Sequence, residues 1–212
     1  MAHSADWLAL DCILTDKVAR ADVAYLVGET KDNARSVLER GADLWKRGLI
    51  PKLAIQKGGD GFGYCGFGYS VEILKRLGIP EQDIVGIEYR FEFGERVINT
   101  LTELITAVRF AKKQEWRRLC LVAPEFHMRR SFLTAVTVID REYPSLKVYS
   151  RVGTPLPEDE MVVHSQGTLT GTRLELATAE DKRIVNYQKS GSPYLLVSVQ
   201  RALVYLEQRD KT

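Results

Sequence analysis

Short apolar runs alternate with amphipathic helical patterns through most of the chain, and this alternation limits the possible folds more than any other feature. Each helical pattern places its apolar residues on one face. A repeated order of strand and helix is typical of a parallel sheet with helices on both faces. We therefore expect an α/β fold, a three-layer α/β/α arrangement with a mainly parallel sheet of about five strands. The expected strands cover 22–28, 52–56, 83–88, 118–123 and 146–150, and the helices between them cover 33–48, 70–78, 97–113 and 127–143.

The alternation stops near residue 150, where the composition changes. A length of 212 residues suits one domain of this kind. We expect a single α/β domain over residues 1–212, with a core at 22–151 and a C-terminal extension at 152–212. The extension begins with turn-rich sequence, including GTPLPEDE and SQGTLTGT, up to about residue 178. Two helices should close the chain, the last of them within PYLLVSVQRALVYLEQ.

Charge, apolar content and cysteine usage narrow the possible partners. The net charge is +2, from 30 basic and 28 acidic residues, so we expect no nucleic-acid partner. No apolar run approaches the ~18 residues of a membrane helix, so we expect no membrane partner. The three cysteines lie at unrelated spacings, which favours a reducing compartment. With no basic leader before an apolar run, the expected location is cytoplasmic. The oligomeric state stays open.

The loop GGDGFGYCGFG at 58–68 follows the second expected strand, and six of its eleven residues are glycine. In an open parallel sheet, ligands bind beyond the carboxyl ends of the strands. Lys57, Gly58 and Gly59 are therefore candidates for a backbone N–H cradle around an anionic group. Two alternatives stay open. The loop is a mobile surface loop, or Gly61-x-Gly63-x-x-Gly66 with Glu88 forms a dinucleotide fingerprint, which is the less favoured interpretation.

Polar residues also follow the third and fourth expected strands. His127, in APEFHMRRSF, is a candidate acid–base group, since its ordinary pKa lies near neutrality. Arg129 is a candidate partner for a phosphate or carboxylate. The alternative is that both residues are structural or solvated. Asn99 and Thr100 begin the long third helix, as ligands or as caps. No metal site is expected from the scattered histidines.

Several short motifs together resemble the YdcF-like family, which includes the SanA and ElyC envelope proteins and is largely of unknown function. The resemblance covers residues 22–151 and implies a Rossmann-like fold. S-adenosylmethionine has been proposed as a ligand for the YdcF branch, so the resemblance implies it as a ligand here. The matching motifs are DVAYLVGE, ERGADLWKRG, LAIQKGG, LKRLGIPEQDIVGIE, NTLTE and APEFHMRRSF.

This chain departs from the family pattern at several positions. Lys57 stands where the family has a serine, and Glu29 stands where it has a second glycine after the first strand. The family glutamate near the start of the second helix is replaced by Gly66 or Phe67, and Glu72 lies nearby out of register. The SanA- and ElyC-type members carry membrane anchors, which we do not find in this sequence.

We therefore expect a protein that binds a small anionic or nucleotide-like molecule, with S-adenosylmethionine as the implied candidate. The competing hypothesis is a non-catalytic interaction or regulatory protein that retains the fold. The sequence does not decide whether the protein is an enzyme. Residues 57–59, Glu88 and His127 should line one cleft, because they follow strands that end at the same edge. The candidate site residues are Lys57, Gly58, Gly59, Glu88, Asn99, Thr100, His127 and Arg129.

Overall fold

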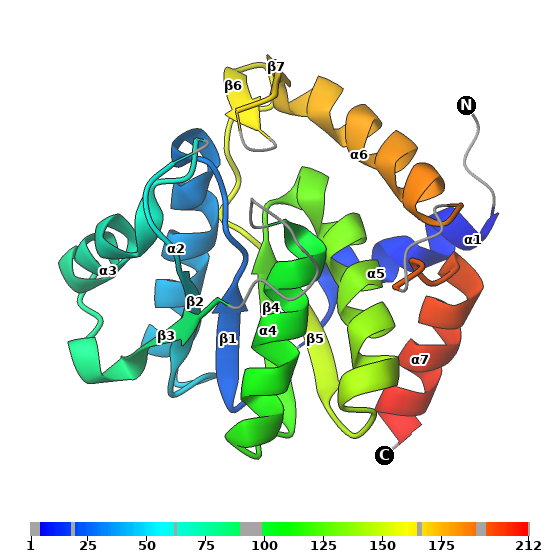
Figure 1. Cartoon of the computed structure of the whole chain (residues 1–212), viewed down its shortest axis with the longest axis horizontal. Helices are drawn as coiled ribbons and strands as arrows, with labels where there is room; N and C mark the ends of the chain where they lie inside the picture. The colour runs from blue at the N-terminus through cyan, green and yellow to red at the C-terminus, as the bar shows by residue number, and fades with distance from the viewer. Residues whose placement is uncertain are drawn as a thin grey trace.

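A five-stranded parallel sheet forms the centre of the molecule (Figure 1). The computed structural model describes residues 5–17, 20–61, 63–89, 99–164, 167–189 and 194–211. Neighbouring strands follow the order β3-β2-β1-β4-β5, and every pair in this sheet is parallel. The predicted α/β/α fold class is confirmed. The strands are β1 (Val23–Leu26), β2 (Leu53–Lys57), β3 (Ile84–Glu88), β4 (Arg118–Ala123) and β5 (Lys147–Val152).

Helices cover both faces of the sheet because alternate strand residues are apolar on both sides. Tyr25 packs in a core cluster with α4 (Thr100–Lys113) and α5 (Glu125–Glu142). Its neighbour Leu26 packs in a second cluster with α2 (Lys31–Lys46) and α3 (Gly66–Arg76). The period of two along each strand therefore builds two separate cores, one on each side of the sheet.

The two ends of the chain meet beside β5. The N-terminal α1 (Ala5–Leu10) lies against the last helix, α7 (Val199–Lys211), and continues into a 3-10 turn, η1 (Asp11–Thr15). Tyr205 on α7 accepts a hydrogen bond at its hydroxyl from the backbone N–H of Val148, at 2.7 Å. The prediction of a last helix within 193–208 is correct in kind, although the helix begins later and ends later than expected.

One predicted helix start is wrong. The helix after the glycine loop begins at Gly66, not at Ser70. Ser70 does not cap it, since its hydroxyl donates back to the carbonyl of Gly66 at 3.1 Å, within the helix. A second short 3-10 turn, η2 (Glu81–Asp83), leads into β3.

The turn-rich segment after β5 contains a hairpin that the sequence did not predict. Strands β6 (Met161–His164) and β7 (Leu169–Thr172) pair antiparallel and lead directly into α6 (Arg173–Tyr187). The hairpin contacts α2, and α6 contacts α5. Figure 1 shows both elements above the end of the sheet where α2 and α5 begin. The C-terminal extension thus covers part of the carboxyl edge.

None of the helices in the described ranges is long and apolar enough to cross a membrane.

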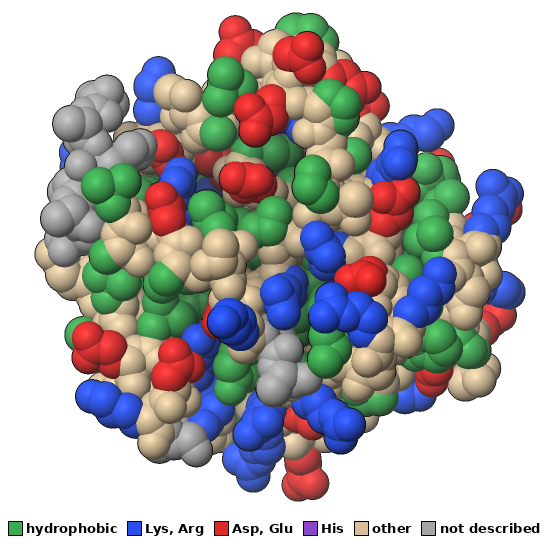
Figure 2. Space-filling view, turned by 180° about the vertical axis from the view of Figure 1, so that it is seen from behind, with side chains coloured by type: hydrophobic (Ala, Val, Ile, Leu, Met, Phe, Trp, Pro, Cys, Tyr) green, Lys and Arg blue, Asp and Glu red, His purple; other side chains and the backbone are tan. Residues whose placement is uncertain are grey.

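The surface seen from behind shows Lys and Arg side chains over much of its lower half, and no histidine is visible on that face (Figure 2). His127 and His164 are both buried, which agrees with this view.

Candidate functional site

The strand order reverses between β1 and β4, and polar side chains gather where these two strands end. The chain runs outward from β1 through β2 to β3 and then returns to place β4 on the other side of β1. Ligand sites in open α/β sheets lie at such switch points. Glu29 follows β1, and His127 lies in the first turn of α5 after β4. Their contact, 2.5 Å between Glu29 Oε1 and His127 Nδ1, joins the two strand ends.

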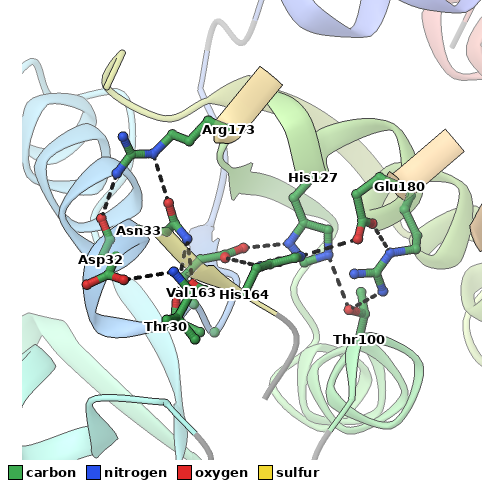
Figure 3. Close-up of polar contacts among 12 residues, drawn as sticks. Thr30, Asp32, Asn33, Thr100, His127, Val163, His164, Arg173 and Glu180 are labelled. Atoms are coloured by element: carbon green, nitrogen blue, oxygen red, sulfur yellow. Dashed lines mark hydrogen bonds and ion pairs between the residues drawn. The ribbon is translucent and has the colours of Figure 1, made fainter. Parts of the chain in front are cut away.

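Around this contact lies a ring of buried polar side chains, which we call the polar ring (Figure 3). His127 Nε2 lies 3.3 Å from Thr100 Oγ1, which accepts a hydrogen bond from Arg130 at 2.7 Å. Arg130 also pairs with Glu180, and Glu180 Oε1 lies 3.3 Å from His164 Nε2. His164 Nδ1 faces Glu29 Oε2 at 3.7 Å, which leaves one link of the ring open. The members of the polar ring are Glu29, His127, Thr100, Arg130, Glu180 and His164.

Burial controls the charge of the ring. It raises the pKa of Glu29 well above its ordinary value, and the nearby Glu103 raises it further. Burial lowers the pKa of His127 well below its ordinary value, and Arg130 adds to the effect. The Glu29–His127 contact therefore joins two neutral groups at neutral pH. The charges of the ring are carried instead by Arg130 and Glu180.

Glu180 keeps its charge although it is buried. Burial alone would raise the pKa of this carboxyl, but the hydrogen bond from His164 and the charge of Arg130 hold the pKa well below the usual range. Burial also lowers the pKa of His164, so this imidazole is neutral. An ionised carboxylate can only accept, which identifies His164 Nε2 as the donor in that hydrogen bond.

The hairpin is fastened to the start of α2 by a second set of contacts. Thr30 donates to the carbonyl of Val163 at 2.6 Å, and Asp32 accepts from the backbone N–H of the same residue at 2.9 Å. Arg173 donates to Asn33 Oδ1 at 2.9 Å and to the carbonyl of Asp32 at 3.0 Å. These contacts keep His164 over the ends of β1 and β4.

A pocket of about 270 Å³ opens beside the ring, between the end of β1, the glycine loop and α2. Its walls are mostly apolar, and Glu29 and Glu103 are among the residues that line it. Glu103 Oε1 accepts from the backbone N–H of Gly28 at 2.7 Å and from the Tyr25 hydroxyl at 2.8 Å. Burial raises the pKa of Glu103, and these two hydrogen bonds limit the rise to about 7. No Lys, Arg or His is among the described residues that line the pocket.

The glycine loop forms one wall of the pocket, and its backbone explains two of its glycines. Gly66 has φ +75°, and a Cβ there would lie 2.9 Å from the backbone nitrogen of Asp60. Gly63 has φ +83°, and a Cβ there would lie 3.3 Å from both Gly167 and Thr30. Both positions combine a left-handed conformation with close neighbours, so only glycine fits without strain. The loop is folded tightly against the site.

The structure separates the predicted site residues into different places. Gly58 and Gly59 line the pocket, as expected. Lys57 and Glu88 do not line it, since they pair with each other at 2.6 Å with largely exposed side chains. His127 lies behind Glu29 and not in the pocket wall. The expectation that residues 57–59, Glu88 and His127 line one cleft is therefore wrong, because β1 and Glu29 lie between the two groups.

The remaining candidates have structural partners. Asn99 caps α4, where its side chain accepts from the backbone N–H groups of Leu101 and Thr102. Thr100 belongs to the polar ring and does not line the pocket. Arg129 pairs with Asp11 at 2.7 Å and with Asp181 at 3.6 Å, which places it away from the pocket.

Sequence reasoning missed most of the ring. Glu29 stands out in the sequence only as a departure from a family glycine, although it directly follows the first strand. Arg130 is the neighbour of the candidate Arg129, and the pocket residue Glu103 stands within the NTLTE motif. His164 and Glu180 lie in the C-terminal extension, far along the chain from β1 and β4. Nothing in their local sequence indicates that they meet Glu29.

A dry cluster of titratable side chains lies next to a mostly apolar pocket. Among the described residues, no group of His, Cys, Asp and Glu has an arrangement that could hold a metal ion. Glu29 Oε2 has no hydrogen-bond partner in the described part of the chain, nor has Gln56 Nε2, and both residues line the pocket. Buried polar atoms without partners are uncommon and often mark sites of function.

Comparisons with protein-family models, with curated proteins and with solved structures each found no match for this chain.

Proposed function

We propose that the pocket binds a small nucleoside-like molecule that carries a positive charge. The observation that carries this proposal is that two buried acidic residues, Glu29 and Glu103, line the pocket, while the described lining has no basic side chain. Ionised Glu103 would attract a cation and repel an anion. The lining charges therefore favour a cationic ligand over the small anionic molecule expected from the sequence.

The walls of the pocket suit the rest of such a molecule. Tyr64 and Phe67 offer aromatic surface to a flat ring or to a cationic centre. One atom of the Gln56 side-chain amide contacts the Tyr25 hydroxyl at 3.4 Å, and the other amide atom has no partner among the described residues. This holds whichever of the two atoms is assigned as oxygen and which as nitrogen, so Gln56 offers one free amide atom to a ligand. The volume of about 270 Å³ suits a nucleoside-sized molecule better than a dinucleotide.

S-adenosylmethionine is the candidate ligand that joins these features, since it has an adenosine body, a sulfonium and an amine. The resemblance to the YdcF-like family supports it independently, and we propose membership of that family. The motif residues Gly58, Asn99 and His127 all stand at the carboxyl edge of the sheet, next to the pocket or the ring. Such clustering is expected if the motifs serve one site.

Calorimetry and thermal unfolding with four probes would test this function. S-adenosylmethionine should bind best, S-adenosylhomocysteine and adenosine less well because they lack the sulfonium charge, and ATP least. At 100 times its dissociation constant, the best ligand should stabilise the fold by about 2.7 kcal/mol. Glu103→Gln should reduce the preference for S-adenosylmethionine over S-adenosylhomocysteine, and Glu88→Gln, outside the pocket, should not.

Two results would count against the proposal. Tightest binding of ATP would show that the pocket selects anions, against the charge argument. Stabilisation by none of the probes would favour the interaction or regulatory protein, in which the polar ring only fastens the C-terminal extension to the core.

A further inference from the structure

The hydrogen bonds of the polar ring allow its protons to be assigned, beginning at Glu180. This carboxylate accepts from Arg130, from Arg183 at 3.0 Å and from His164 Nε2 at 3.3 Å. The proton of the neutral His164 imidazole is therefore on Nε2, and its Nδ1 is a bare acceptor. Nδ1 has no hydrogen-bond partner within the described residues and faces Glu29 Oε2.

The other half of the ring fits the same pattern. Thr100 Oγ1 accepts from Arg130, which leaves the threonine hydroxyl proton free to point at His127 Nε2. A neutral His127 that accepts at Nε2 carries its proton on Nδ1 and donates it to Glu29 Oε1. Every heavy atom in this half then has a partner of the correct kind.

One proton completes the ring, and it belongs on Glu29 Oε2. Two bare acceptors facing each other in a buried site would repel, whereas an O–H on Oε2 pointing at His164 Nδ1 satisfies both. The 3.7 Å separation means that this link is weaker than the others and easily broken. The raised pKa of Glu29 agrees with a carboxylic acid at this position.

We propose that Glu29 is the acid–base residue of the pocket, exchanging a proton with an amine or hydroxyl group of the bound molecule, while His164 and Glu180 hold the proton on the far side. The proposal rests on the proposed function, since it needs a ligand in the pocket. Glu103 then has the separate role of binding positive charge, so two carboxyls in one pocket do different work.

The exchange is balanced in protons and involves no electron transfer. The Oε2 proton of Glu29 passes to His164 Nδ1, which gives an imidazolium beside the Glu180 carboxylate. The Glu29 carboxylate then takes one proton from the ammonium or hydroxyl group of the ligand, which is left as a free amine or alkoxide. Reversal returns both protons. Burial opposes the imidazolium, Glu180 favours it and Arg130 opposes it, so neutral His164 is the preferred state and the imidazolium is the less populated one.

Charged and titratable groups face Glu29 from every element packed around it. The charge on Glu103 disfavours ionisation of Glu29, as does Glu180, whereas Arg130 favours it. Tyr64, in the glycine loop, is held neutral by burial, which raises its pKa. The full set consists of Glu103 on α4, His127 and Arg130 on α5, His164 on β6, Glu180 and Arg183 on α6, and Tyr64 in the loop.

Infrared difference spectroscopy tests the proton on Glu29 without any ligand. Above the pKa of about 7 of Glu103, the protein labelled with ¹³C-glutamate should still show the C=O band of a protonated carboxylic acid. The band should vanish in Glu29→Gln and remain in Glu103→Gln. In His164→Gln, which keeps an amide N–H for Glu180 but removes the Nδ1 acceptor, it should shift to higher frequency. The His164→Gln variant gives an answer even if Glu29→Gln does not fold.

Proton transfer on binding tests the role in the pocket. Both protons stay within the complex, so the measurement is the protonation state of His164: ¹⁵N-histidine NMR should show an imidazolium population at His164 when S-adenosylmethionine is added. This exchange should be lost in Glu29→Gln and kept in Lys57→Met, outside the pocket, and His164→Gln, which lacks the imidazole, identifies the signal. Absence of the Glu29 band overturns the proton assignment whatever the pocket binds. With the band present, binding without Glu29-dependent exchange overturns the acid–base role, and absence of binding by every probe overturns it together with the proposed function.

Discussion

Two cation–carboxylate pairs stand at the carboxyl edge of the same sheet and teach different lessons. Lys57 and Glu88, at the ends of β2 and β3, have side chains 49% and 71% exposed. Arg130 and Glu180, beyond β4, have side chains 8% and 2% exposed. Water screens the first pair and weakens it, whereas the second is held in a dry network where each charge depends on its partner. A close contact between opposite charges therefore says little about its importance until burial is known.

The largest expected effect comes from breaking the buried pair. Arg130→Met leaves the Glu180 charge buried without its main partner and removes the donor to Thr100. Unfolding in denaturant should show a loss of about 3–5 kcal/mol. The matched control is Arg129→Met, the neighbouring arginine on the same helix, whose pairs with Asp11 and Asp181 are partly exposed.

For Arg129→Met we expect a loss of about 1 kcal/mol or less. Equal losses in the two variants would show that burial does not distinguish the two arginines, and the comparison of the pairs would fail.

The second effect is a pH dependence that comes from Glu103. Its pKa is about 7 in the folded protein, against an ordinary value of 4.5, so the fold binds this proton more tightly than the unfolded chain does. The stabilisation is present in full below pH 4.5 and is lost as the pH rises toward 7. Relative to the wild type, Glu103→Gln should therefore gain stability across this window, by on the order of 3 kcal/mol at 1.36 kcal/mol per pKa unit.

The measurement is the free energy of unfolding of both proteins at several pH values. If the free energies of unfolding of the two proteins differ by the same amount at every pH from 4.5 to 7, Glu103 titrates alike in the folded and unfolded states. In that case water reaches the Glu103 carboxyl in the folded protein.

A smaller effect on the free energy of unfolding is expected from changes in the glycine loop, which forms one wall of the pocket. Gly66→Ala forces a left-handed conformation on alanine and presses its Cβ on the Asp60 backbone, so it should destabilise by at least ~1–2 kcal/mol and weaken ligand binding. Gly68→Ala is the control, since nothing lies within 4 Å of a Cβ there. In a helix this change should stabilise by up to ~1 kcal/mol. Thermal unfolding that ranks the two variants alike would refute the backbone argument.

The smallest effect is expected for the exposed pair. Lys57→Met should change the free energy of unfolding by ~0.2–1 kcal/mol, and added salt should reduce the difference further. If Lys57→Met lost as much free energy of unfolding as Arg130→Met, and if salt did not change this loss, Lys57 would have to make a buried interaction. It would then again be a candidate site residue. Denaturant unfolding at low and high ionic strength gives the answer.

Local patterns in the sequence predict most of the fold. The apolar runs mark all five strands of the main sheet to within two residues at each end, because strands buried on both faces are mostly apolar. Boundaries failed where a tertiary contact outweighed a local preference. Gly66 and Gly68 read as helix breakers, yet α3 begins at Gly66, because the left-handed start of the helix packs against Gly59 and Asp60.

The sequence by itself determined the layers, the parallel sheet and the edge at which the carboxyl ends of the strands meet, because periodicity and the order of strands and helices are local properties. It also placed Gly58 and Gly59 correctly beside the pocket. Only the tertiary structure decided which polar residues meet. Glu29, His127 and Glu180 are separated by long stretches of chain, and their charges depend on burial that no local pattern reveals. The hairpin that carries His164 completes the ring, and its position follows from contacts with α2, which the sequence of the extension alone does not encode.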